Sequence, residues 1–255
     1  MEVIKLGLYL TIGMIGVFII LGFFIGWLNK KSINYIYTAF GKTGLYITSF
    51  IGTPIHEFGH YVMCKLFMHK VVEVKWFIPS AVGRGGTLGY VKHSRHNNLY
   101  QRVGDFFIGI GPLFIGSIII VVLSKFLIPN TFNTIFNMIN IHEFNFRDVL
   151  KSIFSIENIS NYKFWIFIIL AISISSHMSL SKPDIENSYF GAITLLFINM
   201  TIAFAFVNLK IDTNLIIKFI YAYNFIFIAL LSIGVISILS TIVLSKLWIG
   251  VKRIA

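Results

Sequence analysis

The sequence has few charged residues and a single cysteine. Charged side chains make up 12% of the 255 residues, while hydrophobic residues make up 56%; soluble domains carry roughly a quarter charged residues. This shortage of charge excludes an ordinary soluble domain and predicts a membrane protein. The lone Cys64 excludes an internal disulfide and a cysteine-rich metal site.

Long stretches without Asp, Glu, Lys or Arg predict the membrane spans. A helix needs about 20 apolar residues to cross ~30 Å of hydrocarbon, and five charge-free stretches are near or above this length. A sixth stretch lacks Lys and Arg but contains His56, Glu57 and His60. We therefore expect an all-α polytopic membrane protein that forms one membrane-embedded domain over 1–255. Its six expected spans are 4–28, 43–66, 103–127, 163–181, 188–209 and 217–247.

Basic residues are spread over short connections between these spans. The net charge is +11, from 21 Lys and Arg against 10 Asp and Glu, and this dispersal argues against nucleic-acid binding. Between residues 65 and 102 there are seven basic residues and one acid, Glu73. The positive-inside rule makes this connection cytoplasmic, and with six spans both termini as well. The abundance of Ile, Phe, Asn and Lys points to a bacterial plasma membrane.

The same connection contains the signals of a β-hairpin. "VVEVKWFIPS" and "TLGYVKHS" are rich in strand-forming residues, and "AVGRGG" between them is typical of a turn. We expect a small cytoplasmic hairpin over 71–94, with an irregular basic loop as the alternative. His69, His93 and His96 are expected to be solvated. Asp105 is expected to pair with Arg102, three residues earlier on the next helix.

The segment "HEFGH" carries the chemistry. On a helix His56 and His60 lie one turn apart on one face, where both imidazoles can bind one ion. Glu57 can then reach a water on that ion as a general base, and Zn²⁺ is the expected cofactor. The alternative is a packing or hydrogen-bonding role. A buried acid costs about 2.5–3.5 kcal/mol inside a span, which favours function.

A catalytic zinc usually takes a third protein ligand. The candidates near membrane depth are Asp105, His177, Asp184 and Glu186. Pro183 ends the fourth span and places Asp184 on the same side as the histidine pair, so Asp184 is favoured. The alternative is that Ser181 caps the next helix and Asp184 complements its dipole.

His177 is a possible auxiliary residue. It lies seven residues before Asp184, on the same face if the helix continues. Its ring can donate to a substrate carbonyl or to the transition-state oxyanion. The alternative is a hydrogen bond to a neighbouring span.

Together, "HEFGH" in a span, the hairpin-forming connection, "GIGPLFIGS" in the next span and an aspartate in a later span resemble the site-2 protease family of intramembrane zinc metalloproteases. The resemblance covers about Thr43 to Phe190. It implies that His56, His60 and Asp184 bind zinc and that Glu57 is the catalytic base. It also implies a transmembrane or membrane-anchored peptide as substrate, which unwinds before it is cleaved.

Two other classes of membrane protein would use part of the same motif. A non-proteolytic membrane metal-binding protein, either a transporter or an inactive scaffold, would keep the histidine pair but would not need Glu57. A membrane protease of the prenyl-protein type would need a downstream Glu followed four residues later by His or Asp. Glu143, Glu157 and Glu186 are instead followed by Arg147, Asn161 and Phe190, so this class is disfavoured.

Overall fold

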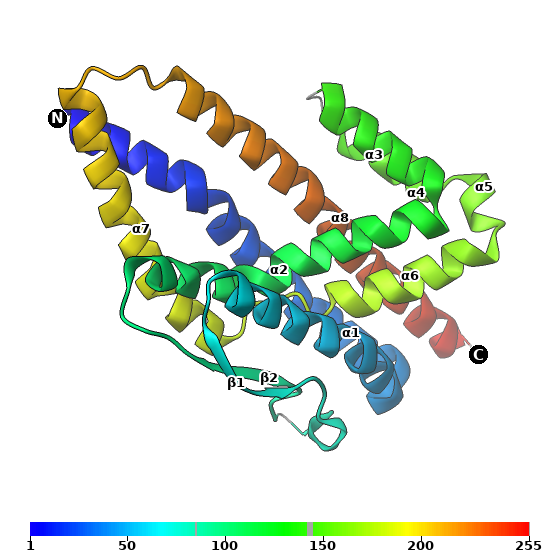
Figure 1. The fold of residues 1–255 in the computed structure, drawn as a ribbon. Helices are drawn as coiled ribbons and strands as arrows, with labels where there is room; N and C mark the ends of the chain where they lie inside the picture. The colour runs from blue at the N-terminus through cyan, green and yellow to red at the C-terminus, as the bar shows by residue number, and fades with distance from the viewer. Residues whose placement is uncertain (85, 142–144, 255) are drawn as a thin grey trace.

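The protein is a bundle of long helices with a two-stranded antiparallel sheet beside it (Figure 1). The computed structural model describes residues 1–84, 86–141 and 145–254, so residue 85 of the expected hairpin and Glu143 lie outside the described residues. The elements, in chain order, are α1 (Glu2–Leu66), β1 (Lys70–Lys75), a 3-10 turn (Pro79–Ala81), β2 (Tyr90–Ser94), α2 (Leu99–Leu127), α3 (Pro129–Ile141), α4 (Phe146–Ile153), α5 (Ile156–Ile159), α6 (Tyr162–Ser175), α7 (Lys182–Asn208) and α8 (Asn214–Ile254).

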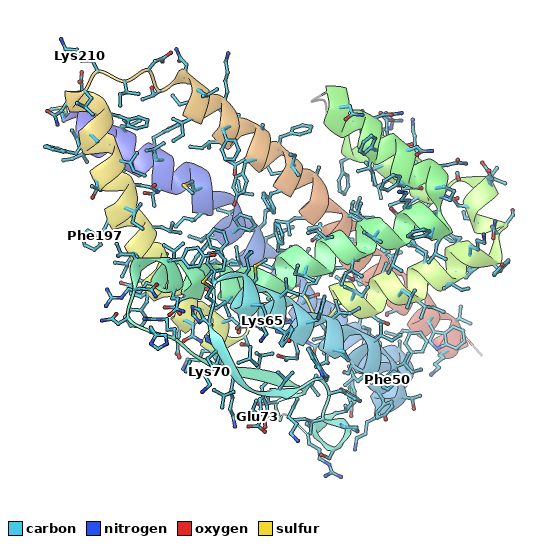
Figure 2. All side chains as sticks on the ribbon, viewed as in Figure 1. Phe50, Lys65, Lys70, Glu73, Phe197 and Lys210 are labelled. Atoms are coloured by element: carbon cyan, nitrogen blue, oxygen red, sulfur yellow. The ribbon has the colours of Figure 1, made fainter. Side chains whose placement is uncertain are left out.

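Within the described residues, four helices are long and apolar enough to cross a membrane: α1, α2, α7 and α8. Large apolar side chains point outward from them, and Phe50 and Phe197 are 60% and 67% exposed (Figure 2). A surface with so much exposed apolar area suits contact with lipid. The expectation of a helical membrane protein with a small hairpin agrees with this architecture. Six separate spanning helices are not found among the residues that the structure describes.

Helix α1 consists of two helical halves joined at Gly41. This residue has φ 62° and ψ −152°, a combination that is almost restricted to glycine. The chain reverses its direction at Gly41. The half before it runs away from the N-terminus, and the half after it runs back toward β1 (Figure 1). The expected spans 4–28 and 43–66 therefore both lie in α1, on either side of Gly41.

The first half of α1 and helix α8 run in the same direction. Asn224 Nδ2 donates to the carbonyl of Gly13 at 2.8 Å, and Lys252 Nζ donates to the carbonyl of Ala39 at 2.9 Å. Residue numbers thus rise together along both helices. Six alternating spans would make the first and the last antiparallel, so the structure differs from the expected topology.

The difference arises at α6 and α7, which follow one another along α2. The contacts that establish this are Gly116 with Ile174, Gly109 with Asp184, and Phe106 with Gly191. Both helices therefore run antiparallel to α2, and the expected spans 163–181 and 188–209 form one path with a break at residues 176–181. The 14 residues of α6 extend for about 21 Å, less than the ~30 Å of a hydrocarbon core.

The expected hairpin is present, and it lies alongside α1. Strands β1 and β2 pair antiparallel with a bulge near the start of β1. Beyond β1, the ring of Phe77 packs against Tyr46 and Phe50 of α1, with centroids 5.8 and 5.9 Å apart. These aromatic contacts keep the hairpin beside the second half of α1.

The second half of α1 crosses α2 at very close range. A Cβ added to Gly59 would lie 2.8 Å from Cα of Pro112. The missing side chain of Gly59 thus lets a neighbouring helix approach closely. The approach brings the histidine face of α1 against the backbone of α2.

Candidate metal centre

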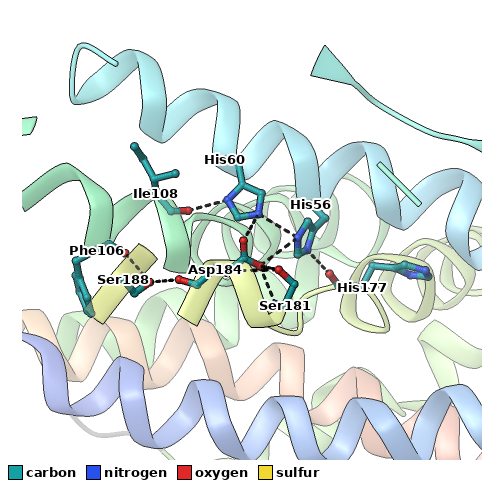
Figure 3. Close-up of polar contacts among 8 residues, drawn as sticks. All are labelled: His56, His60, Phe106, Ile108, His177, Ser181, Asp184 and Ser188. Atoms are coloured by element: carbon teal, nitrogen blue, oxygen red, sulfur yellow. Dashed lines mark hydrogen bonds and ion pairs between the residues drawn. The ribbon is translucent and has the colours of Figure 1, made fainter. Parts of the chain in front are cut away.

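His56 and His60 are each oriented by a main-chain carbonyl (Figure 3). Nδ1 of His56 lies 2.6 Å from the carbonyl oxygen of His177, and Nδ1 of His60 lies 2.8 Å from that of Ile108. A carbonyl oxygen only accepts hydrogen bonds, so each Nδ1 carries the proton. In the neutral rings both Nε2 atoms then present a lone pair.

Proline explains why the carbonyl of Ile108 is available. Inside a helix the carbonyl of residue i accepts from the N–H of residue i+4, which for Ile108 is position 112. Pro112 stands there and has no N–H. The carbonyl of Ile108 therefore accepts a hydrogen bond from the Nδ1–H group of His60 instead. The "GP" pair in "GIGPLFIGS" thus serves the orientation of a ligand on another helix.

Asp184 reaches the cluster from the first turn of α7. Its Oδ2 accepts from the N–H of Ser181 at 2.7 Å, and its own N–H donates to Oγ of Ser181 at 3.4 Å, so the two residues form a capping box. Oδ2 also accepts from the Ser181 hydroxyl at 2.6 Å. Its Oδ1 lies 3.3 Å from Nε2 of His60. The capping role and the position expected of a ligand therefore occur in the same side chain.

The three side chains converge on one point between α1 and α7. Nε2 of His56 and Nε2 of His60 are 3.1 Å apart, and the candidate ligand atoms of His56, His60 and Asp184 all lie within 4.8 Å of one another. Two nitrogens that bind one tetrahedral zinc at about 2.0–2.1 Å are about 3.3 Å apart. Facing lone pairs at this distance repel unless a cation lies between them, so this group can hold a metal ion.

Glu57 lines the same cavity as the three candidate ligands. The cavity has a volume of about 500 Å³, with walls formed by α1, the break between α6 and α7, and hairpin residues 86–91. Glu57 is 6% exposed, and a Cβ added to Gly89 would lie 2.8 Å from its Cγ. The hairpin thus covers Glu57 while its carboxylate still borders the cavity. This arrangement suits a general base beside a bound metal.

His177 contributes through its main chain. Its Nδ1 donates to the carbonyl of Ser173 and its Nε2 accepts from the hydroxyl of Ser49, both at 3.1 Å. The neutral ring has no further N–H for a substrate oxyanion in this arrangement. The continuous helix assumed between His177 and Asp184 is also absent, because α6 ends at Ser175. The sequence does not predict that the main-chain carbonyl of His177 orients His56, since no side-chain pattern marks such a carbonyl.

The other two candidate ligands lie apart from the cluster. Asp105 accepts from Nε of Arg95 at 2.9 and 3.1 Å, and Arg102 binds Asn97 instead. The expected Arg102–Asp105 pair is therefore wrong, because the chain after β2 folds Arg95 onto α2. Glu186 faces outward beside Lys182, with Nζ and Oε1 3.7 Å apart.

Two histidines expected to be solvated are part of the packed structure. His69 is 3% exposed; its Nε2 donates to the carbonyl of Gln101 at 2.9 Å, and its Nδ1 accepts from Nδ1 of His93 at 3.0 Å. His93 also borders the cavity. The period of two in β2, which puts Val91 and His93 on one face, was the signal that this histidine faces inward. His96 is exposed, as expected.

We predict that His93 makes the protein less stable in acid. Burial, and then the nearby His69, lower the pKa of His93 from 6.5 to about 4. The unfolded chain therefore takes up a proton as the pH falls below 6.5, while the folded chain stays neutral to about pH 4. The free energy of unfolding should fall over this window by on the order of 1–2 kcal/mol, after allowance for solvent screening.

Melting temperatures of the protein in neutral detergent, measured from pH 7 to pH 4, test this prediction. His93→Gln should flatten the pH dependence relative to the wild type, whatever its effect at pH 7. His96→Gln, a change in the exposed histidine of the same connection, should leave the slope unchanged. Equal slopes for wild type and His93→Gln would contradict the prediction.

Comparisons of the chain with models of protein families, with curated proteins and with solved structures give no match. The resemblance to site-2 proteases therefore rests on the short motifs quoted above. The function is inferred from the geometry of the cluster and its cavity.

Proposed function

We propose that the protein is an intramembrane zinc metalloprotease that hydrolyses peptide bonds within or near a transmembrane segment. The observation that carries the proposal is the convergence of two Nε2 lone pairs and a carboxylate oxygen beside Glu57 in one cavity. Two imidazoles and a carboxylate are a ligand set found in catalytic zinc sites, which leave one coordination position open. A transporter or an inactive scaffold would need the ligands but would gain nothing from Glu57.

In this proposal each residue has a separate role. His56, His60 and Asp184 would hold Zn²⁺, which would lower the pKa of a water toward ~7 and polarise the carbonyl to be attacked. Glu57 would accept a proton from the attacking water, whose oxygen adds to the carbonyl carbon, and would deliver that proton to the amine nitrogen as the C–N bond breaks. The Ser181 donors to Oδ2 orient the carboxylate of Asp184, and such supporting contacts commonly affect metal affinity 10–100-fold.

The substrate class follows from the surroundings of the cavity. It is lined by the hairpin and by helices with apolar outer surfaces, so we expect its substrates to come from the membrane. A helical peptide bond has its carbonyl engaged with the N–H four residues on, and must unwind before attack. The hairpin backbone at residues 86–91 forms one wall of the cavity, against which an extended chain can lie.

We predict that Glu57→Gln abolishes cleavage and keeps the metal, because Gln has nearly the same shape but cannot act as a base. Asp184→Ala should lose most of the metal, since one of three ligands is removed. The measurements are metal analysis of the purified proteins and mass spectrometry of single-span membrane peptides co-expressed with each variant. Cleavage that survives in Glu57→Gln would exclude the proposed mechanism.

A matched control is available in Glu186→Gln. Glu186 is an acid on the first turns of α7, exposed and outside the cluster, so this variant should keep both metal and cleavage. Metal retained in Asp184→Ala at the wild-type level would assign the third ligand elsewhere. Metal bound by every protein without any cleaved peptide would favour the transporter or scaffold.

We further predict that Pro112→Ala stabilises α2 but weakens metal binding. Alanine restores an N–H that competes with His60 Nδ1 for the carbonyl of Ile108, while a proline inside a helix costs about 3 kcal/mol. The metal dissociation constant should rise about 10-fold or more although the melting temperature of the metal-free protein rises. Pro54→Ala, a control inside α1, should leave metal affinity unchanged. Unchanged affinity in Pro112→Ala would remove the role given to the proline.

We also propose five membrane passages in place of six: the two halves of α1, then α2, then α6 and α7 together, and α8. This count follows from the parallel course of α8 and the first half of α1. It puts the two termini on opposite sides of the membrane, where the expectation was that both are cytoplasmic. The metal cluster then lies at the break within one passage, as in membrane proteins with discontinuous helices.

Reporter fusions test the topology. Alkaline phosphatase and green fluorescent protein, fused in turn to each terminus in a bacterial host, should report opposite sides for the N- and C-terminus. The same reporter result at both termini would restore an even number of passages.

A further inference from the structure

A second cavity lies between the first half of α1 and α8, away from the metal cluster's lining residues. Its volume is about 580 Å³, and its lining includes Lys31 of α1 and Lys246 of α8. The charge-free stretch of α1 ends at Leu28 and that of α8 ends at Ser245. Because the two helices are parallel, both lysines lie just beyond the apolar stretch of their helix, at the same end of the bundle.

The two lysines bring positive charge that no acid offsets. Nζ of Lys31 lies 3.7 Å from the centroid of the Trp27 ring, and Nζ of Lys246 lies 5.0 Å from that of Tyr35. Within the described residues neither lysine forms a salt bridge, and the cavity lining contains no Asp or Glu. An aromatic face orients an ammonium group without neutralising it. The cavity lining therefore presents two exposed cations to an anion.

The rest of the lining is apolar and matches lipid. Phe24, Leu28, Leu239 and Ile242 border the cavity, and Leu28 is 3% exposed. Trp and Tyr next to Lys at the end of an apolar stretch are typical of the membrane–water interface. Basic pockets between transmembrane helices bind the headgroups of anionic lipids.

We propose that this cavity binds one anionic phospholipid, with its phosphate between Lys31 and Lys246 and its glycerol and first acyl carbons on the apolar lining. A free phosphate ion would use the lysines but leave the apolar lining uncovered. A zwitterionic phosphocholine lipid brings a cation of its own toward the lysines. The structure therefore favours a lipid with net negative charge, such as phosphatidylglycerol.

The test is native mass spectrometry of the full chain in neutral detergent, with phosphatidylglycerol, phosphatidylcholine or inorganic phosphate added in parallel titrations. Phosphatidylglycerol should bind as a one-to-one complex at the lowest concentration of the three. The double variant Lys31→Gln/Lys246→Gln should bind it about 30-fold more weakly, from the loss of two lysines near a membrane surface.

Two matched variants separate a specific site from general attraction. Lys5→Gln/Lys218→Gln removes the same charge from exposed positions near the opposite ends of the same two helices, and should bind phosphatidylglycerol like the wild type. Lys31→Arg/Lys246→Arg keeps both charges and should retain most of the affinity. Equal melting temperatures of the lipid-free proteins would show that the glutamine variant is folded; if that variant melts lower, the arginine variant decides.

Three results would overturn the proposal. One is equal affinity of the wild type and the Lys31→Gln/Lys246→Gln variant for phosphatidylglycerol. Another is equal binding of phosphatidylcholine, which would mean an apolar groove without selectivity for charge. The third is displacement of the lipid by inorganic phosphate at similar concentration, which would mean a site for the free ion.

Discussion

The two imidazole nitrogens of His56 and His60, 3.1 Å apart, are the constraint on which the surrounding structure depends. Both carry lone pairs, because their Nδ1 protons are used by the carbonyls of His177 and Ile108. Facing lone pairs at this distance repel unless a cation lies between them, and such a cation would be favoured by a negative charge close by. Asp184 supplies it, from a part of the chain that is distant in sequence.

Both orienting carbonyls are available because regular helix is interrupted where they occur. The carbonyl of Ile108 lacks its usual partner because position 112 is proline. The carbonyl of His177 is free because α6 has ended, and the N–H of Ser181, four residues on, donates to Asp184 instead. Exposed irregular backbone at membrane depth is costly unless its groups are paired. Here the unpaired groups left by two interruptions are taken up by the cluster itself, so the broken backbone and the site stabilise each other.

Much of the fold and of the candidate site could be predicted from local sequence patterns. The HExxH spacing fixes which side chains share a helix face, charge-free length marks the apolar helices, and β-branched runs around a glycine-rich turn mark the hairpin. The direction of each helix could not be predicted, because an apolar stretch has the same composition whichever way it crosses the membrane. For that reason the sequence predicts two antiparallel spans over 163–181 and 188–209, whereas α6 and α7 run in the same direction. The partner of Asp105 and the burial of His69 also depended on tertiary packing, since Arg95 and Gln101 are brought close by the fold around β2.

Asp184 shows why two interpretations of one residue need not exclude each other. To cap α7, the Asp184 carboxylate has to accept from Ser181, and to act as a candidate ligand it has to face α1. A side chain with one acceptor oxygen could do only one of these. A carboxylate has two oxygens with about four acceptor sites. Oδ2 takes both hydrogen bonds from Ser181, while Oδ1 remains directed at His60. The capping bonds restrict rotation of the side chain, so the motif that starts α7 also preorganises its first acid as a candidate ligand.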